Sequence, residues 1–322
     1  MKITELYRDL HSDLAYIEKE LERAVDTAQP DLRKASFHLL KAGGKRIRPV
    51  FVLLSGQFGR YDLDKVKNVA VALEFIHMAS LVHDDVIDDA DVRRGRPTIK
   101  SKWDNRVAMY TGDYMFSRAL EIVTNLDNPV IHKMLSKAMV DMTLGEIEQI
   151  RDLFDWHQNL RHYLRRVKRK TALLIAVSCC LGSVSAEVDA EVAKQLYRFG
   201  YYVGMSYQIT DDILDFVGTE KELGKPAGSD LRQGNVTLPV LYTLHKENGR
   251  DDLVAFLQSS DQREARWREV LDQVRHSGGI EFSQKLSERY LDKALEVLES
   301  LPDLKARRSL YEIAGYIGRR KF

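Results

Sequence analysis

The chain has very little cysteine and little proline. Its two cysteines, Cys179 and Cys180, are adjacent and lie in an apolar run, so they cannot link distant segments. This arrangement excludes a disulfide scaffold and favours a reducing compartment, and we expect a cytoplasmic protein. Only seven prolines occur among 322 residues, and none lies between Pro129 and Pro226. Proline therefore interrupts few of the helices that this sequence can form.

An excess of charge of one sign is also missing. The 49 Lys and Arg residues nearly balance the 48 Asp and Glu residues, which leaves a formal net charge of +1. The chain as a whole has no strong attraction to nucleic acid or to anionic membranes, so any polyanion must be bound by a local cluster. A hydrophobic fraction of 44% argues against a disordered protein.

No hydrophobic run is long enough to cross a bilayer. The longest one, Ala172 to Gly182, is well short of the roughly 20 residues that a membrane-spanning helix needs. The first residues enter a charged amphipathic stretch and not the apolar segment of a signal peptide. We therefore expect neither a transmembrane segment nor a leader.

Apolar residues recur at helical spacing along nearly the whole chain. Two such stripes are Leu6, Leu10, Leu14, Ile17 and Leu21, and Val71, Phe75, Met78 and Val82. Alternating runs bounded by hairpin turns are not evident, so the pattern predicts an almost entirely helical protein. We expect one domain over residues 1–322, in which the N-terminal helix of residues 1–29 serves as an interface.

Turn-forming residues predict where the helices are interrupted. Glycine allows backbone conformations that other residues avoid, and proline cannot continue a helix. The expected breaks are Gln29-Pro30, Ala42-Gly43-Gly44, Gly95-Arg96-Pro97, Asp127-Asn128-Pro129, Gly182-Ser183 and residues 224–235.

An acidic pentad occurs twice, each time after an apolar stretch. The two copies are Asp84-Asp85-Val86-Ile87-Asp88 and Asp211-Asp212-Ile213-Leu214-Asp215. Residues three and four apart share one face of a helix, so each copy places carboxylates on a single turn. These carboxylates repel one another, and a Mg²⁺ ion removes that penalty. One such pentad is often a solvated helix end. Two copies with apolar flanks predict a site for a magnesium-bound di- or triphosphate, with carboxylates on opposite sides of one cavity.

A diphosphate site also needs cations. Residues 43–49 combine a flexible glycine turn with three cations, and residues 93–96 place three more after the first pentad. Each has a plainer interpretation, a solvated basic turn in the first case and pairing with nearby aspartates in the second. Six of the ten residues from Arg161 to Lys170 are cationic. We interpret most of this run as an exposed basic face, with Lys170 pointing inward because it borders an apolar segment.

The sequence resembles the trans-isoprenyl diphosphate synthases. The resemblance is carried by GGKRIRP (43–49), LVHDDVIDDADVRRGRPT (81–98), GDYMF (112–116), KT (170–171) and YQITDDILDF (207–216). It implies an all-α fold, a single-domain isoprenoid-synthase helical bundle around a deep central cavity. More narrowly, residues 80–106 and 228–242 resemble the catalytic component, component 2, of the two-component heptaprenyl diphosphate synthases.

The resemblance implies a role for each motif residue. The implied catalytic residues are Asp84, Asp85, Asp88, Asp211, Asp212 and Asp215. Two or three Mg²⁺ ions would be held by Asp84, Asp88 and Asp211. The allylic diphosphate would be contacted by Arg93, Lys170, Thr171 and Gln208. Isopentenyl diphosphate would be held by Lys45, Arg48, His77 and Arg94.

Two features qualify this correspondence. Asn235 stands after Gly234 where many relatives have a lysine, and Gln233 stands where they often have an acidic residue. The role of that lysine toward the allylic diphosphate is therefore not carried over. The basic C-terminus, Arg319-Arg320-Lys321, is a candidate for reaching the isopentenyl site, as basic C-termini do in some relatives.

The implied reaction is a head-to-tail condensation of isopentenyl diphosphate onto an allylic diphosphate, with farnesyl diphosphate as the expected primer. The expected product is an all-trans heptaprenyl diphosphate for a quinone side chain. Ala79 and Ser80 are small residues just before the first aspartate, where short-chain relatives carry bulky aromatics. Together with Ile76 and Leu73 they predict a deep tunnel for the product. The plainer interpretation is that small residues allow close helix packing.

Partners and alternatives complete the prediction. The narrower resemblance implies a heterodimer with a small noncatalytic component 1, and a homodimer is the alternative assembly. A hexaprenyl or shorter-chain synthase, a noncatalytic helical subunit and a terpene cyclase are the competing functions. A nucleic-acid partner is not expected, because residues 161–170 lack interleaved stacking aromatics.

Overall fold

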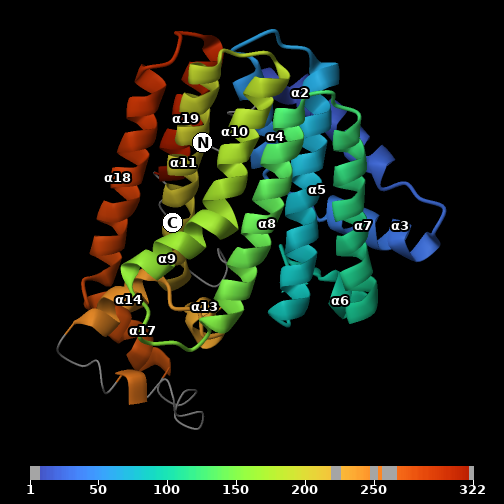
Figure 1. Cartoon of the computed structure of the whole chain (residues 1–322). Coiled ribbons are helices and arrows are strands. Elements are labelled where there is room, and N and C mark those ends of the chain that lie inside the picture. The colour runs from blue at the N-terminus through green and yellow to red at the C-terminus, as the bar shows by residue number, and fades with distance from the viewer. Residues whose placement is uncertain (1–7, 219–225, 247–252, 256–266, 319–322) are drawn as a thin grey trace. The chain divides into compact units, whose positions relative to one another are not determined.

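The computed structural model describes residues 8–218, 226–246, 253–255 and 267–318. Within these residues the regular structure is almost entirely helical, which confirms the predicted all-α fold (Figure 1). The helices are η1 Arg8–Leu10, α2 His11–Ala24, α3 Pro30–Lys41, α4 Ile47–Gly56, α5 Leu63–Ile87, α6 Ile99–Lys102, α7 Asn105–Thr124, α8 Pro129–Arg151, α9 Leu160–Val167, η2 Lys168–Ala172, α10 Leu173–Ser185, α11 Ala190–Val217, α13 Ser229–Arg232, α14 Leu238–His245, α17 Trp267–His276, α18 Gly279–Glu299 and α19 Lys305–Gly318.

The chain divides into two compact units, and each is assembled from three segments. The first unit comprises Met1–Val140, Leu174–Gly200 and Leu295–Ile313. The second comprises Asp141–Leu173, Tyr201–Ala294 and Ala314–Phe322. Helices α8, α10, α11, α18 and α19 contain residues of both units. The first unit holds the first acidic pentad, and the second unit holds the second.

Helix α5 is the central element of the first unit. It lies beside α4 and α7 (Figure 1), and most of its side chains are buried. The contact with α7 is close at Gly112, where a Cβ atom would lie 2.3 Å from Nε2 of His83. Nearby, the rings of Phe51 and Phe199 meet edge to face with centroids 6.0 Å apart. Apolar packing thus anchors the helix that ends in Asp84–Asp88.

Most of the predicted helix breaks are confirmed, but the one at Gly182-Ser183 is wrong. Helix α10 continues through both residues to Ser185. A Cβ atom at position 182 would lie 2.2 Å from the carbonyl oxygen of Val52 on α4. Glycine is therefore present at this position because two helix backbones approach closely, and not because the chain turns.

A short hairpin follows α5 and was not anticipated as strand structure. Strands β1, Val92–Arg93, and β2, Arg96–Pro97, pair antiparallel. The two residues between them, Arg94 and Gly95, have φ values of 54° and 72°. Left-handed conformations at both central residues are typical of two-residue hairpin turns, and their twist suits the flanking strands. Arg93 and Arg94 thus lie in a hairpin that begins a few residues after the end of α5.

The second unit contains a buried core of its own. Helix α14 packs against α9 and α17. The core cluster includes Trp156, Tyr163, Val167, Phe216 and Trp267. Between α9 and α10, the segment η2 has π-helical hydrogen bonding. Single π turns within helices are rare and occur often at functional sites. This one contains Lys170 and Thr171.

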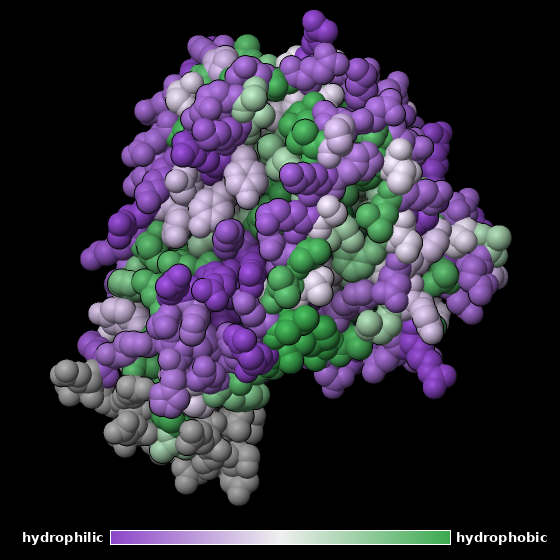
Figure 2. Space-filling view, viewed as in Figure 1, coloured by the Kyte–Doolittle hydropathy of each residue, from purple (hydrophilic) through white to green (hydrophobic). Residues whose placement is uncertain are grey.

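Several hydrophobic side chains of helix α8 are exposed to solvent. Leu144, Ile147 and Ile150 are 43%, 57% and 48% exposed. Figure 2 shows hydrophobic residues scattered among hydrophilic ones on the face where α8 lies. Among the described residues, a helix long and apolar enough to span a membrane is not found.

Candidate active site

Both acidic pentads lie at the C-terminal ends of long helices, as the sequence predicts. The first ends α5, and Asp88 is its C-cap. The second lies in the last turns of α11, which ends at Val217. The C-terminal end of a helix carries partial negative charge, so carboxylates there weaken the helix. Helix stability therefore does not explain the pentads, and violations of local preference of this kind occur typically at functional sites.

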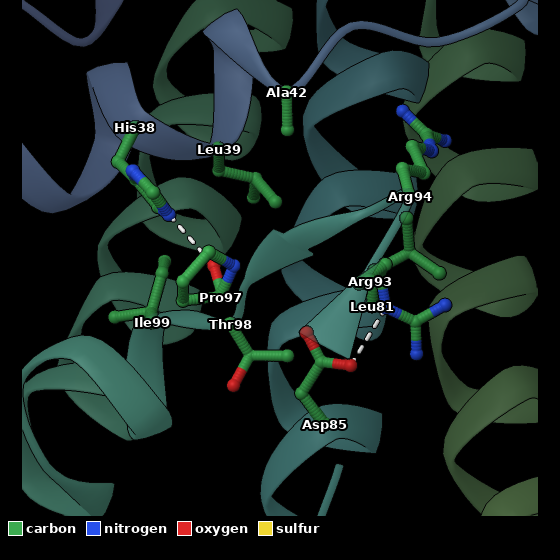
Figure 3. A pocket seen from close by; sticks show the side chains of 10 residues that line it. All are labelled: His38, Leu39, Ala42, Leu81, Asp85, Arg93, Arg94, Pro97, Thr98 and Ile99. Carbon is green, nitrogen blue, oxygen red and sulfur yellow. Dashed lines mark hydrogen bonds and ion pairs between the residues drawn. The ribbon is translucent and has the colours of Figure 1, made fainter. Parts of the chain in front are cut away.

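In the first pentad, Asp85 is turned into the protein. Its side chain is only 3% exposed and accepts a hydrogen bond of 2.6 Å from Nε of Arg93 on β1 (Figure 3). Burial raises the pKa of Asp85, Arg93 opposes this shift, and the nearby charges of Asp84 and Asp88 add to it. Asp84 and Asp88 are partly exposed and lie one turn apart. These two carboxylates are more accessible than that of Asp85.

Figure 3 shows a small pocket between α3, the end of α5 and the hairpin. Asp85, Arg93 and Arg94 belong to its wall. The hairpin is tied to α3 because Nε2 of His38 lies 2.8 Å from the carbonyl oxygen of Pro97. Helix α3 and the hairpin thus hold Arg93 against the acidic end of α5.

The predicted isopentenyl diphosphate residues gather in the first unit. The turn before α4 approaches Arg94 so closely that a Cβ atom at Gly44 would lie 2.6 Å from Nη1 of Arg94. Burial lowers the pKa of His77 well below its usual value, and the charges of Arg48, Arg94, Arg93 and Arg46 lower it further. These effects place His77 among several guanidinium groups. A concentration of positive charge around a neutral imidazole is suited to binding a diphosphate. Lys45 is exposed on the same turn.

In the second pentad, Asp212 is buried in a hydrogen-bonded chain. Its Oδ2 accepts a bond of 2.7 Å from the hydroxyl of Tyr163, and its Oδ1 accepts one of 2.8 Å from Nε2 of Gln208. Oε1 of Gln208 in turn accepts a bond of 2.6 Å from Oγ1 of Thr171. Burial raises the pKa of Asp212 to about 7, and the charge of Asp230 adds to this shift. Asp212 therefore orients Gln208 and, through it, Thr171.

Asp215 is buried as well and organises the segment that follows. Its Oδ1 accepts a bond of 3.0 Å from the hydroxyl of Ser229, and its Oδ2 accepts one of 3.2 Å from the backbone N–H of Asp230. Both donors belong to α13. Asp211 is partly exposed. The second pentad thus repeats the pattern of the first, in which buried carboxylates stand next to a partly exposed one.

The π turn presents the predicted lysine and threonine. Nζ of Lys170 donates a bond of 3.0 Å to Oε1 of Gln149 and lies 3.4 Å from Oε2 of Glu146, both on α8. A Cβ atom at Gly204 of α11 would lie 2.5 Å from Cα of Ala172. This close approach fixes the π turn against the helix that carries Gln208 and Asp211.

Arg166 does not belong to the exposed basic face expected for residues 161–170. Arg161, Arg165 and Lys168 are exposed, but Arg166 is only 9% exposed. Its Nη1 donates a bond of 2.8 Å to Oε1 of Gln158, and its Nη2 bonds to the carbonyl oxygen of Val236. Arg166 and Tyr163 are three residues apart on α9, so they share its buried face.

The motifs in the sequence do not point to several of these contacts. Three residues outside the motifs bind candidate residues, namely Tyr163, Glu146 and Gln149. Arg166 lies over the ring of Tyr163. The apolar spacing of Tyr163 and Val167 was the available signal for an inward face of α9. Asn235 donates its backbone N–H to the carbonyl oxygen of Asp230 at 2.8 Å. The basic residues 319–321 lie outside the described residues.

The predicted chain-length residues are largely enclosed. Ala79, Ile76 and Leu73 are fully buried. Ser80 is partly buried, and its hydroxyl donates a bond of 2.8 Å to the carbonyl oxygen of His77. Burial of this kind is expected both for a tunnel wall and for close helix packing, so the role of these residues stays a prediction.

The donor chemistry of the pentads fits Mg²⁺. Carboxylate oxygens are the ligands that this ion prefers, and it is typically bound by one or two of them together with water and substrate phosphates. In the part of the chain that the structure describes, no group of three or more His, Cys, Asp or Glu side chains is arranged so that it could hold a metal ion.

Comparison with known proteins defines the class. Residues 29–274 match the sequence model of the polyprenyl synthetase family. The chain belongs to the polyprenyl synthetase family, and the predicted resemblance is confirmed.

Individual relatives show a more specific similarity than the family model does. The chain is 58% identical over 322 residues to the heptaprenyl diphosphate synthase component 2 of Bacillus subtilis (strain 168), covering all of this chain and 92% of the relative. It is similar to the crystal structure of a heptaprenyl diphosphate synthase from Staphylococcus aureus, with a TM-score of 0.91, 40% identity and coverage of 97% and 98% of the two chains. A Caulobacter crescentus polyprenyl synthase complexed with calcium and isoprenyl diphosphate gives a TM-score of 0.93 at 29% identity, covering 100% and 98%.

Proposed function

We propose that this chain is the catalytic component of a two-component heptaprenyl diphosphate synthase. It condenses isopentenyl diphosphate onto an allylic diphosphate, with farnesyl diphosphate as the primer, and its product supplies a quinone side chain. The observation that carries this proposal is the pair of complete acidic pentads, each with at least one carboxylate oriented by hydrogen bonds, in a chain that is 58% identical to a component 2.

The proposed metal ligands are Asp84, Asp88 and Asp211. Their partial exposure, compared with the burial of Asp85 and Asp212, supports this assignment. Asp84 and Asp88 of the first unit and Asp211 of the second would hold two or three Mg²⁺ ions together with the allylic diphosphate. When bound, Mg²⁺ stabilises the negative charge that develops on the departing diphosphate. The Caulobacter structure is described as a complex with calcium and isoprenyl diphosphate, which supports divalent cation binding in the family.

The protein's own cations divide between two substrates. Arg93 and Lys170 would bind the allylic diphosphate, assisted by Thr171 and Gln208, whose positions are set by hydrogen bonds to Asp212. Fixed positive groups aimed at a leaving diphosphate lower the barrier because they need no rearrangement as charge develops. A serine or cysteine nucleophile is not needed. Isopentenyl diphosphate would be held by Lys45, Arg48, His77 and Arg94, which the first unit gathers.

The assembly is part of the proposal. The name of the Bacillus relative, component 2, implies a second chain in that enzyme. We propose that a small noncatalytic component 1 binds this chain as well, and a homodimer of this chain is the alternative. The two free, buried cysteines support the reducing, cytoplasmic environment expected from the sequence.

A synthase with a hexaprenyl or shorter product is the nearest alternative, because one prenyl unit leaves no clear trace in the sequence. A noncatalytic helical subunit would be expected to carry degenerate acidic motifs, and both motifs of this chain are complete. A terpene cyclase would be expected to lack the cations of the isopentenyl subsite.

A single incubation tests the proposal. The chain is mixed with Mg²⁺, farnesyl diphosphate and labelled isopentenyl diphosphate, with and without component 1, and the products are separated by chromatography. We expect heptaprenyl diphosphate when both components are present. A hexaprenyl product would support the nearest alternative, and full long-chain activity of the chain alone would exclude the need for the partner. Absence of any elongated product with both chains present would contradict the proposal.

A further inference from the structure

Arg46 is not used by the substrate roles proposed above. It lies between Lys45 and the start of α4, and it is the N-cap of that helix. Its φ of 45° is left-handed, which is uncommon for a residue other than glycine. Its side chain is only 10% exposed, whereas Lys45 is exposed. Arg46 therefore points into the protein while its neighbour faces solvent.

Three helices supply the partners of Arg46. Its Nε and Nη2 donate to the two carboxylate oxygens of Glu18 on α2, with an Nη2–Oε2 distance of 3.1 Å. Its Nη1 donates a bond of 3.0 Å to Oε1 of Glu74 on α5. Its Nη2 also donates to the carbonyl oxygen of Leu40 on α3 at 3.4 Å. The paired bonds to Glu18 form a fork, that is, a bidentate interaction. Such a pair is strong and also fixes the orientation of the guanidinium group.

The network determines the backbone of the turn. A non-glycine residue in the left-handed region is strained and persists only where its surroundings enforce it. The fork to Glu18 and the bond to Glu74 provide this enforcement. If they were lost, Arg46 would relax toward the right-handed region and change the directions of Lys45 and Arg48.

The network also connects the turn to the helix that carries His77. Glu74 precedes His77 by three residues on α5, so the two share a face of that helix. Glu74 is only 4% exposed, and its Oε2 makes no hydrogen bond with the described residues. A buried carboxylate in this position depends on Arg46 for compensation of its charge. The Arg46–Glu74 contact therefore fixes the position of the turn relative to the helix that carries His77.

We propose that Glu18, Arg46 and Glu74 are positioning residues for the isopentenyl diphosphate subsite. The inference rests on the function proposed above for Lys45, Arg48 and His77. Glu18 belongs to α2, His11–Ala24, which precedes the residues 29–274 matched by the family model. The N-terminal helix, expected from the sequence to serve as an interface, thus contributes to a substrate subsite.

The test is Glu18→Gln in the full chain. Glu18 is 41% exposed and Arg46 keeps Glu74 as a partner, so the variant is expected to fold. Titration calorimetry with isopentenyl diphosphate alone should show a Kd raised about tenfold, the usual scale for losing a group that orients a ligand-binding side chain. The Kd for farnesyl diphosphate with Mg²⁺ should not change. Glu20→Gln is the matched control, because Glu20 pairs with Arg23 on the same face of α2 and lies outside the network.

Two further variants make the result decisive. Arg46→Lys keeps the charge but loses the fork, and it should raise the Kd for isopentenyl diphosphate as Glu18→Gln does, with the thermal midpoint measured for both. Arg48→Ala tests the proposed subsite itself. If Arg48→Ala weakens isopentenyl diphosphate binding and neither network variant does, the positioning role is wrong and the proposed function stands. If Arg48→Ala has no effect, the proposed subsite is wrong, and the inference that depends on it fails too.

Discussion

At the scale of single residues, the two pentads show that identical side chains on one helical turn take different roles. Asp85 and Asp212 are buried and bound by Arg93 and by Tyr163. Asp84 and Asp211, each the immediate neighbour of a buried aspartate, are partly exposed. Each pentad therefore combines a partly exposed carboxylate, which we propose as a metal ligand, with a buried one that is hydrogen-bonded to surrounding side chains.

We predict that Asp84→Ala or Asp211→Ala lowers turnover by orders of magnitude. Each change removes a proposed metal ligand, so the charge on the leaving diphosphate loses part of its stabilisation. The helical circular dichroism spectrum should stay unchanged, because carboxylates at helix C-termini do not stabilise the helix. Steady-state assays with farnesyl and isopentenyl diphosphates provide the measurement. A near-normal rate in either variant would refute the metal assignment.

His77 is expected to make the stability of the protein sensitive to acid. Burial and then the charges of Arg48 and Arg94 lower its pKa in the folded state, so the unfolded state binds more protons at acid pH. Stability from this group is complete above the unfolded pKa of about 6.5 and is lost as the pH falls below it. Thermal unfolding of the metal-free chain at pH 7.5 and pH 5 should show a smaller drop for His77→Gln than for the wild type.

The surface residue His162 provides the control for this measurement. It is exposed on α9, so His162→Gln should leave the pH dependence of the thermal midpoint as it is in the wild type. Equal loss of stability between the two pH values in His77→Gln and in the wild type would contradict the assignment of the acid sensitivity to His77.

At the scale of helices, close backbone contacts set the positions of the site-bearing elements. Gly182 allows α10 to approach Val52 of α4, and Gly204 allows α11 to approach Ala172 in the π turn. By its intrinsic helix propensity, glycine destabilises the interior of a helix. Here it is a packing residue, which explains why a helix break was wrongly predicted at position 182.

We predict that Gly182→Ala destabilises the protein by about 1–3 kcal/mol, the typical cost of overpacking a core. The sign of this change in stability is informative, because alanine in place of glycine within a helix usually adds stability. The measurement is the urea midpoint followed by circular dichroism. Ser117→Ala, at an exposed position of α7, should change the midpoint little. A stabilised Gly182→Ala variant would show that α4 and α10 can separate without cost.

At the scale of the whole molecule, the proposed activity depends on groups that come from many segments. The second unit alone joins α9, the π turn, α11 and α13 through Tyr163, Thr171, Gln208 and Asp215. The product length is a further property of this scale, because a growing isoprenoid chain must be enclosed along its entire length.

We predict that Ala79→Phe shortens the product. Ala79 is fully buried on α5, five residues before Asp84. If the product tunnel follows α5, an aromatic ring at this position blocks the tunnel and leaves a shorter space for the product. Chromatography of the product made with component 1 present provides the measurement, and the unfolding midpoint shows whether the ring is accommodated. A folded, active variant with an unchanged product length would favour close helix packing as the role of the small residue.

The sequence by itself determined the helical periodicity, the two pentads at helix ends and the clusters of cations. These depend on residues close together in the chain, which share a helical turn wherever that helix lies. Only the tertiary structure decided that Arg46 and Arg166 turn inward and that Asp85, Asp212 and Asp215 are bound within the protein. These outcomes depend on partners such as Glu18, Val236 and Tyr163, which are distant in the chain and are brought near only when the helices pack. Burial and pairing are properties of packed surfaces, and periodicity alone does not specify which surfaces meet.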